Sequence, residues 1–152
     1  MSDEELAEFL ARGEEGYRRQ LVDFAGMGEE EATAKAARDY PGLFPGGRPL
    51  PDHFVFVVEE VSGHAVGHVF YAVRPPGSRK AWLYDIEIAE ESRGRGYGRE
   101  AMRLFEEEAA DRGITTVGLH VFGGNEPARS LYRSLGYREL GVEMTKPLAE
   151  PK

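Results

Sequence analysis

The feature that most constrains the fold is a glycine-rich stretch, Arg93-Gly94-Arg95-Gly96-Tyr97-Gly98, set between two largely apolar segments. Residues 82–89 form a mainly apolar and aromatic run, which predicts a β-strand. Residues 100–112 carry apolar side chains at helical spacing with charges between them, which predicts an amphipathic helix. A glycine-rich turn at this place presents backbone N–H groups at the positive end of the helix dipole. The stretch therefore predicts a pyrophosphate site, with an ordinary loop as the alternative on these residues alone.

Two better-known phosphate-binding motifs do not fit this stretch. The dinucleotide fingerprint needs Gly-x-Gly-x-x-Gly, whereas the chain offers Gly94-x-Gly96-x-Gly98. A nucleotide P-loop needs Gly-Lys-Ser/Thr, which occurs nowhere in the sequence. The pattern that fits is R-x-x-G-x-G, over Arg93–Gly98.

A second block lies downstream, residues 119–137, with the sequence LHVFGGNEPARSLYRSLGY. It resembles the L-x-V-x-x-x-N-x-x-A-x-x-L-Y-x-x-x-G-[FY] block of the GNAT family, the GCN5-related, acetyl-CoA-dependent N-acyltransferases. The two blocks come in the order and at the spacing of that family. The resemblance covers residues 53–148 and implies the family's fold, its acetyl-CoA co-substrate and its chemistry.

Composition sets limits on this interpretation. The 152 residues predict a single acyltransferase domain, 1–152, with a helical acceptor-side region at 1–50 and a core with the cofactor site at 53–148. No apolar run is long enough for a membrane span, no secretory leader is visible and there are no cysteines, so we expect a cytoplasmic protein. The net charge of −8 argues against a nucleic-acid partner and favours cationic partners. Assembly as a homodimer is left open.

The predicted elements give an α/β fold, with a mixed sheet sandwiched by helices. A capping box at Ser2 and Glu5 begins a first helix, which Gly13 and Gly16 weaken. The remaining predicted elements are a helix at 29–40, strands at 53–61, 65–73, 81–89 and 114–121, helices at 100–112 and 125–135, and a last strand at 137–146. The opening strand that is usual in the GNAT family has no room before the first helix.

The resemblance implies a set of cofactor contacts. The strand residues Ile86, Glu87 and Ile88 would line the pantetheine arm and thioester through backbone groups. Residues Arg93 to Arg99 would hold the pyrophosphate, inside a basic cluster of Arg93, Arg95, Arg99 and Arg103. Asn125 matches the family's asparagine near the cofactor arm, with a plain helix N-cap as its alternative.

Two catalytic tasks remain, protonation of the departing thiolate and deprotonation of the amine. Tyr132 matches the family's tyrosine that donates a proton to the thiolate, with a packed core aromatic as the alternative. The candidate bases are Glu87, Asp85 and His120, and Glu87 is preferred to Asp85. Water is the alternative to all three. We expect no metal site, because His64 and His68, four residues apart on one strand, would be about 13 Å apart.

The predicted function is transfer of an acetyl group from acetyl-CoA to a primary amine of a small molecule, peptide or protein, by direct attack in a ternary complex. The alternative is an acyl-CoA-binding sensor or regulatory domain without turnover. Retention of Tyr132 together with Glu87 favours the enzyme.

Overall fold

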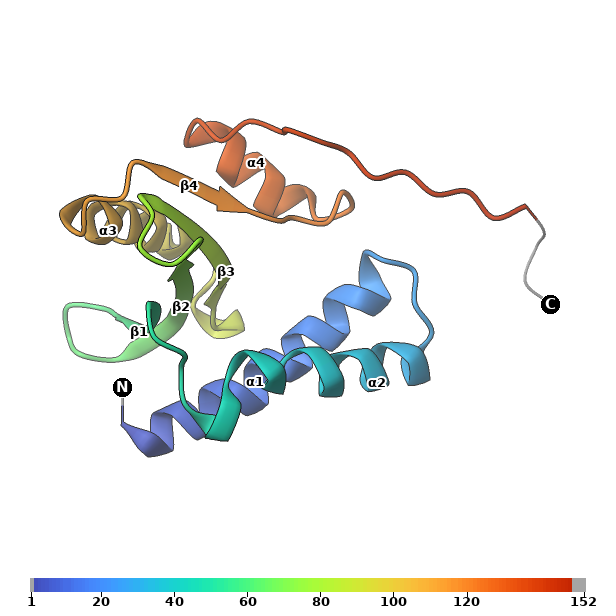
Figure 1. The fold of residues 1–152 in the computed structure, drawn as a ribbon, viewed down its shortest axis with the longest axis horizontal. Coiled ribbons are helices and arrows are strands. Elements are labelled where there is room, and N and C mark those ends of the chain that lie inside the picture. The colour runs from blue at the N-terminus through green and yellow to red at the C-terminus, as the bar shows by residue number, and fades with distance from the viewer. Residues whose placement is uncertain (1, 149–152) are drawn as a thin grey trace. The chain divides into compact units, whose positions relative to one another are not determined.

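The computed structural model describes residues 2–148, in eight main elements (Figure 1). Two compact units, residues 1–120 and residues from 121 onward, are described separately. The first unit holds α1 (Asp3–Asp23), α2 (Glu29–Asp39), β1 (His53–Glu59), β2 (Ala65–Val73), β3 (Lys80–Ile88), α3 (Tyr97–Asp111) and β4 (Thr116–Leu119). Short 3₁₀ turns lie at Pro41–Leu43, Pro45–Gly47 and Glu90–Ser92. The second unit holds α4 (Glu126–Ser134).

The four strands form one mixed sheet in the order β1-β2-β3-β4. The first three strands pair antiparallel, and β4 pairs parallel to β3. The connection from β3 to β4 runs through α3, as a parallel pair requires. This confirms the predicted mixed sheet, and no strand precedes His53 within residues 2–148.

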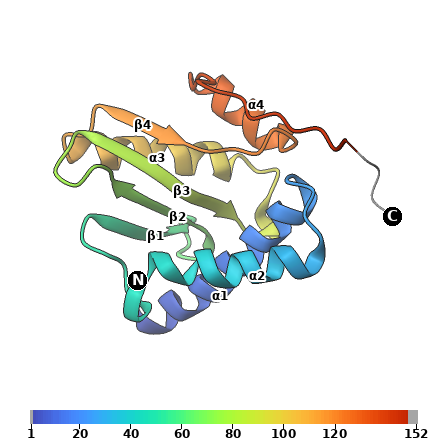
Figure 2. The same cartoon turned by 45° about the vertical axis from the view of Figure 1, so that its right-hand side comes forward.

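The sheet lies between α3 on one face and the α1–α2 pair on the other (Figure 2). Alternation along β2 explains how one strand serves both faces. Tyr71 packs on Phe105 of α3, with ring centroids 4.9 Å apart, whereas Phe70 packs on Phe9 of α1, 6.1 Å away. A buried aromatic core of Phe9, Tyr40, Phe44 and Phe70 therefore fixes the helical pair to the sheet.

Gly13, which weakens α1 on propensity grounds, has a packing role. A Cβ atom built on Gly13 would lie 1.9 Å from the hydroxyl oxygen of Tyr40, far inside contact distance. The missing side chain lets the Tyr40 ring lie directly against α1. A glycine in the middle of a helix costs about 1 kcal/mol of stability relative to alanine. At Gly13 it also provides the space in which the Tyr40 ring packs.

The register between β2 and β3 places His68 directly opposite Glu87, and Gly67 opposite Ile88. A Cβ atom on Gly67 would lie 2.1 Å from the Glu87 carbonyl oxygen, so only glycine permits this backbone approach. The glycine thus allows the tight pairing that sets which β2 residues meet which β3 residues.

One predicted element is wrong. Residues 137–146 alternate apolar and polar side chains as a strand does, but the structure assigns them no strand. Within the described chain no backbone hydrogen bond joins a residue beyond Tyr137 to a partner, and a strand exists only where a neighbour pairs with it. The other predicted boundaries agree with the structure to within a few residues.

Candidate active site

Three titratable side chains meet on the face of the sheet that α1 covers. His68 and Glu87 are cross-strand partners, and Asp85 lies two residues before Glu87 on β3. The His68 Nε2 atom is 2.7 Å from Asp85 Oδ2, a hydrogen bond. One nitrogen or oxygen atom from each of the three residues falls within 4.8 Å of the others. The structure thus brings the predicted bases Asp85 and Glu87 together and adds a histidine.

Exposure of these side chains increases from His68 to Glu87. Side-chain exposure is 11% for His68, 20% for Asp85 and 38% for Glu87. The Phe9 ring lies edge-on to the His68 ring, with centroids 4.6 Å apart, and covers the histidine. Glu87 is therefore the member of the cluster that an incoming molecule reaches first, and the His68–Asp85 pair lies behind it.

Tyr40 completes the cluster from the helical side. Its hydroxyl oxygen is buried, and it has no hydrogen-bond partner among the described residues, although the residue is only 7% exposed. Burial raises the pKa of the Tyr40 phenol far above its ordinary value of 10.0, and the charges of Asp85 and Glu87 raise it further. Tyr40 is therefore a neutral hydrogen-bonding group close to two carboxylates, and it is not a base.

The space beside Glu87 is kept open by a second glycine of α1. A Cβ atom on Gly16 would lie at ordinary contact distance, 3.5 Å, from Glu87 Oε2, so any longer side chain would crowd the carboxylate. On the other side of the same carboxylate, Arg93 Nη2 lies 3.8 Å from Oε1. Glu87 thus stands between the helical pair and the first residue of the glycine-rich loop.

The glycine-rich loop has the geometry of an anion site. Gly94 and Gly96 have φ angles of 80° and 81°, which favour glycine, and Gly96 is the N-cap of α3 without a side-chain cap. The Glu100 N–H donates to the Gly96 carbonyl over 3.1 Å. This bond closes the first turn of α3. The backbone N–H groups of residues 97–99 therefore lie at the N-terminal, positive end of the helix.

Two side-chain bonds hold the ends of this loop. Arg93 Nε donates to the Ile88 carbonyl over 2.9 Å, and the Tyr97 hydroxyl donates to Glu60 Oε2 over 2.8 Å. The predicted basic cluster is smaller than expected, because Arg103 pairs with Glu100 and Glu107 of its own helix. Arg93, by contrast, lies at the start of the loop, beside the end of β3.

The end of β3 next to the cluster has a strand partner on one side only. β4 pairs with β3 only from Lys80 to Leu83. Within the described chain, residues 84–88 therefore have no strand partner on the β4 side, although β2 pairs with residues 85–88 on the other. This stretch contains Ile86, Glu87 and Ile88, whose backbone was expected to line the cofactor arm.

The remaining predicted site residues lie at ordinary structural positions. His120 is exposed and directly follows β4, outside the His68–Asp85–Glu87 cluster. In the second unit, Asn125 is the N-cap of α4, and its side-chain oxygen accepts from the Ala128 N–H over 3.4 Å. Asn125 therefore caps α4, and its contact with the cofactor arm stays a prediction. Tyr132 lies on α4 and its ring meets that of Tyr137, with centroids 5.8 Å apart.

Sequence reasoning missed His68 as a member of the site. His68 was considered only as a metal ligand with His64, which precedes β2 in the structure. The cluster of His68 with two carboxylates offers donor types that a divalent cation or an ammonium group can use. The signal that identifies it is the β2–β3 register, which the sequence alone does not contain.

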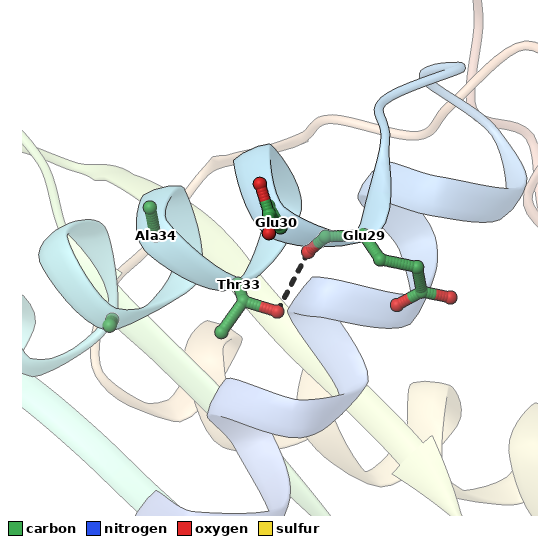
Figure 3. Close-up of a pocket in the computed structure, with 5 residues that line it drawn as sticks. Glu29, Glu30, Thr33 and Ala34 are labelled. Atoms are coloured by element: carbon green, nitrogen blue, oxygen red, sulfur yellow. Dashed lines mark hydrogen bonds between the residues drawn. The ribbon is translucent and has the colours of Figure 1, made fainter.

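A hollow on the surface of α2 does not resemble an active site (Figure 3). Its lining comes from one helix, with Glu29, Glu30, Thr33 and Ala34 around it. The Thr33 hydroxyl donates to the Glu29 carbonyl over 2.8 Å, so this polar group is already satisfied.

No helix within residues 2–148 is long and apolar enough to cross a membrane.

Comparison with known proteins decides the family. The sequence model of the Acetyltransferase (GNAT) family matches residues 14–137. The chain belongs to the GNAT acetyltransferase family. It is therefore an acetyl-CoA-dependent N-acetyltransferase, which favours the enzyme over the alternative of a binding domain without turnover.

Two GNAT relatives from Bacillus subtilis match nearly the whole chain. The uncharacterized N-acetyltransferase YdgE is 28% identical over 97% of this chain and 95% of its own length. The uncharacterized N-acetyltransferase YycN is 29% identical over 97% of this chain and 96% of its own. The crystal structure of YycN, described as a putative acetyltransferase, superposes with a TM-score of 0.92 over 99% of this chain and 96% of that one.

Proposed function

We propose that the His68–Asp85–Glu87 cluster and the Tyr40 hydroxyl form the acceptor site, where a primary amine of a small molecule, peptide or protein is bound and deprotonated. The observation that carries this proposal is the buried Tyr40 hydroxyl, which lacks a partner among the described residues. Buried polar groups are nearly always hydrogen-bonded, so a hydroxyl in this position points to a ligand. The two neighbouring carboxylates favour a ligand that arrives as an ammonium ion.

The geometry supplies the acceptors that such an ion needs. An ammonium group carries three N–H donors, and Asp85, Glu87 and the Tyr40 oxygen offer three acceptors. Glu87 is the most exposed of the three cluster side chains, and it serves as the base that takes the proton, directly or through water. His68 holds Asp85 in place through the 2.7 Å hydrogen bond and acts as a positioning residue.

The acetyl donor would bind on the other side of Glu87. The backbone N–H groups of the 93–99 loop would hold the pyrophosphate, and residues 86–88, on the side of β3 that β4 does not reach, would pair with the pantetheine arm. The thioester would then lie beside Glu87, and the amine would attack the acetyl carbon directly. The thiolate then leaves with a proton, for which Tyr132 is the proposed donor.

The test is release of free thiol from acetyl-CoA in the presence of a panel of primary amines, including monoamines, diamines and peptides with free N-termini. At least one amine is expected to support turnover. For that amine, Asp85→Asn should raise KM about tenfold, a loss of about 1.4 kcal/mol of binding, and leave the Kd of acetyl-CoA unchanged. An unchanged amine KM in a folded Asp85→Asn variant would remove the acceptor site from this cluster.

The exposed glutamate Glu59 on β1 offers a matched control, because Glu59→Gln also removes one negative charge from the sheet. It should leave the amine KM unchanged. Equal effects of Asp85→Asn and Glu59→Gln would show that overall charge, and not the cluster, attracts the amine.

A further inference from the structure

The His68–Asp85–Glu87 cluster has the geometry of a metal site built on two neighbouring strands. Asp85 and Glu87 are two residues apart on β3, so their side chains share one face of the sheet, and His68 lies directly opposite Glu87 on β2. One possible ligand atom from each residue lies within 4.8 Å of the other two. Ligand atoms about 2.1 Å from a tetrahedral ion are roughly 3.4 Å from one another, so small rotations of these side chains would complete the set.

The charges of the cluster favour a divalent cation. Among the ion pairs of residues 2–148, Asp85 pairs with His68 and with no lysine or arginine. Arg93 Nη2 lies 3.8 Å from Glu87 Oε1, but the arginine side chain is 57% exposed, so this pair is weak. Two carboxylates this close repel each other, and one divalent ion between them would neutralise both.

The types of ligand select the metal. An imidazole nitrogen favours Zn²⁺ and the other late first-row divalent ions, whereas Mg²⁺ and Ca²⁺ prefer sites made of oxygen. Three protein ligands leave the fourth position of a tetrahedral zinc ion open for water. The chain has no cysteine that could bind zinc elsewhere. The cluster therefore fits Zn²⁺ better than Mg²⁺ or Ca²⁺.

The Tyr40 hydroxyl is an independent indication of a ligand at this place. It is buried, on a residue that is 7% exposed, and it has no hydrogen-bond partner among the described residues. The hydroxyl lies against Gly13 of α1, and Glu87 Oε2 lies near Gly16, one turn further along the same face of that helix. A water molecule bound to the metal would therefore give the hydroxyl the partner that it lacks.

We propose that His68, Asp85 and Glu87 bind Zn²⁺, and that the bound ion keeps the amine out of the acceptor site. On binding, His68 Nε2 exchanges its hydrogen bond to Asp85 for the metal, and the ring proton lies on Nδ1. An ammonium ion and Zn²⁺ would use the same carboxylate oxygens, so only one of them can be bound at a time. The exclusion of the amine rests on the acceptor site proposed above, whereas the metal binding does not.

This proposal differs from the expectation of no metal site because the ligand set is different. That expectation considered His68 together with His64 on one strand. The β2–β3 register instead joins His68 to two carboxylates of the neighbouring strand.

The first test measures metal binding without any substrate. Protein freed of metal by a chelator is titrated with Zn²⁺ by calorimetry and with Co²⁺, whose visible absorption reports its ligands. One ion per chain is expected. His68→Gln should raise the Kd of Zn²⁺ at least tenfold, or about 1.4 kcal/mol, and should abolish the rise in Tm that Zn²⁺ gives the wild type. Glu87→Gln, at the most exposed position of the cluster, is the safer variant for folding and should weaken binding likewise.

His64→Gln is the matched control, because His64 is exposed and precedes β2. It should leave the Kd of Zn²⁺ unchanged. A wild-type protein that binds no Zn²⁺, or binding that survives both His68→Gln and Glu87→Gln, would overturn the proposal. So would an equal loss of affinity in His64→Gln, because the ion would then be held by surface histidines.

The second test measures turnover of the amine at fixed concentrations of free Zn²⁺. The acetylated amine is followed by mass spectrometry, because the thiol of released coenzyme A also binds zinc. At free Zn²⁺ equal to its calorimetric Kd, the KM of the amine should rise about twofold, with kcat and the Kd of acetyl-CoA unchanged. An unchanged KM despite His68-dependent binding would overturn the exclusion and place the acceptor elsewhere. Failure of the first test, by contrast, would leave the acceptor site as proposed.

Discussion

The two proposed halves of the active site are built in different ways. The 93–99 loop is made of backbone, with two glycines in left-handed conformations at the start of α3. The His68–Asp85–Glu87 cluster is made of side chains from β2 and β3, and Tyr40 joins it from the end of α2. A backbone site recognises a group that every substrate shares, here a pyrophosphate. In a site made of side chains, by contrast, a substitution can change which amine is bound without disturbing the 93–99 loop.

The comparison predicts that side-chain variants lose turnover and backbone variants lose cofactor affinity. The largest effect is expected for Tyr132→Phe, which keeps the ring packed on Tyr137 and removes only the hydroxyl. Loss of a general acid should lower kcat about 10²- to 10⁴-fold, with the Kd of acetyl-CoA little changed. Stopped assays of thiol release and calorimetry of acetyl-CoA binding measure the two quantities. Full activity would reduce Tyr132 to a core aromatic.

The second prediction concerns the base. Glu87→Gln keeps the shape of the side chain and should lower kcat/KM about 10²-fold, because the amine then loses its proton acceptor. The ascending limb of the pH profile of kcat/KM should shift or disappear. His120→Gln, outside the cluster, should leave the profile unchanged. If both variants keep the wild-type limb and rate, the limb reports the ionisation of the amine itself, and the enzyme works mainly by positioning.

The third prediction concerns the backbone half. Gly96→Ala forces a Cβ onto a residue with φ of 81° and should raise the Kd of acetyl-CoA about tenfold, or about 1.4 kcal/mol. Gly63→Ala is the matched control, since Gly63 has φ of 90° in the hairpin turn before β2. It imposes a similar backbone strain away from the loop and should leave the Kd unchanged. Equal Kd values for the two variants would break the comparison.

The fourth prediction separates stability from function at Tyr40. Tyr40→Phe removes a buried hydroxyl that has no partner within residues 2–148. The free energy of unfolding should therefore rise by about 1 kcal/mol, because the cost of burying the hydroxyl disappears. The KM of the amine should rise several-fold at the same time. Denaturant melts and steady-state kinetics on one preparation give both values, and a stabilised variant with unchanged KM would take Tyr40 out of the acceptor site.

The smallest effect is expected at Asp39, which links the helical pair. Its carboxylate accepts from Lys35 over 2.7 Å and from the Tyr17 hydroxyl over 3.2 Å. These bonds, the one from Lys35 above all, lower the pKa of Asp39 below its ordinary 3.8. Because the folded-state pKa is the lower one, the stabilisation is fully present above the ordinary value and is lost as the pH falls through the folded value. The difference in unfolding free energy between wild type and Asp39→Asn should therefore vanish in strong acid. A difference that persists there would assign the effect to packing.

The same comparison explains what the sequence could reveal. The glycine-rich loop was predictable because its residues are contiguous and its conformation follows from glycine between a strand and a helix. The strands of the sheet followed from local periodicity and turn residues. The cluster was only half predictable: Asp85 and Glu87 share a face by strand parity, whereas His68 and Tyr40 come from segments whose register and docking are tertiary. Residues 137–146 show the limit, since an alternating pattern does not say whether a neighbouring strand pairs with it.

Gly67 shows how substitution of a purely structural residue can abolish activity. It takes no part in the proposed chemistry, yet a side chain at this position would collide with the Glu87 backbone and force β2 and β3 apart. A slip of one residue between these strands would turn His68 away from Glu87, because neighbouring positions face opposite sides of a sheet. In a screen for inactive variants Gly67 would therefore score like a catalytic residue. A rescue experiment would distinguish Gly67 from a catalytic residue. Its substitution disturbs the β2–β3 register, so no added amine, buffer base or change of pH could restore the rate.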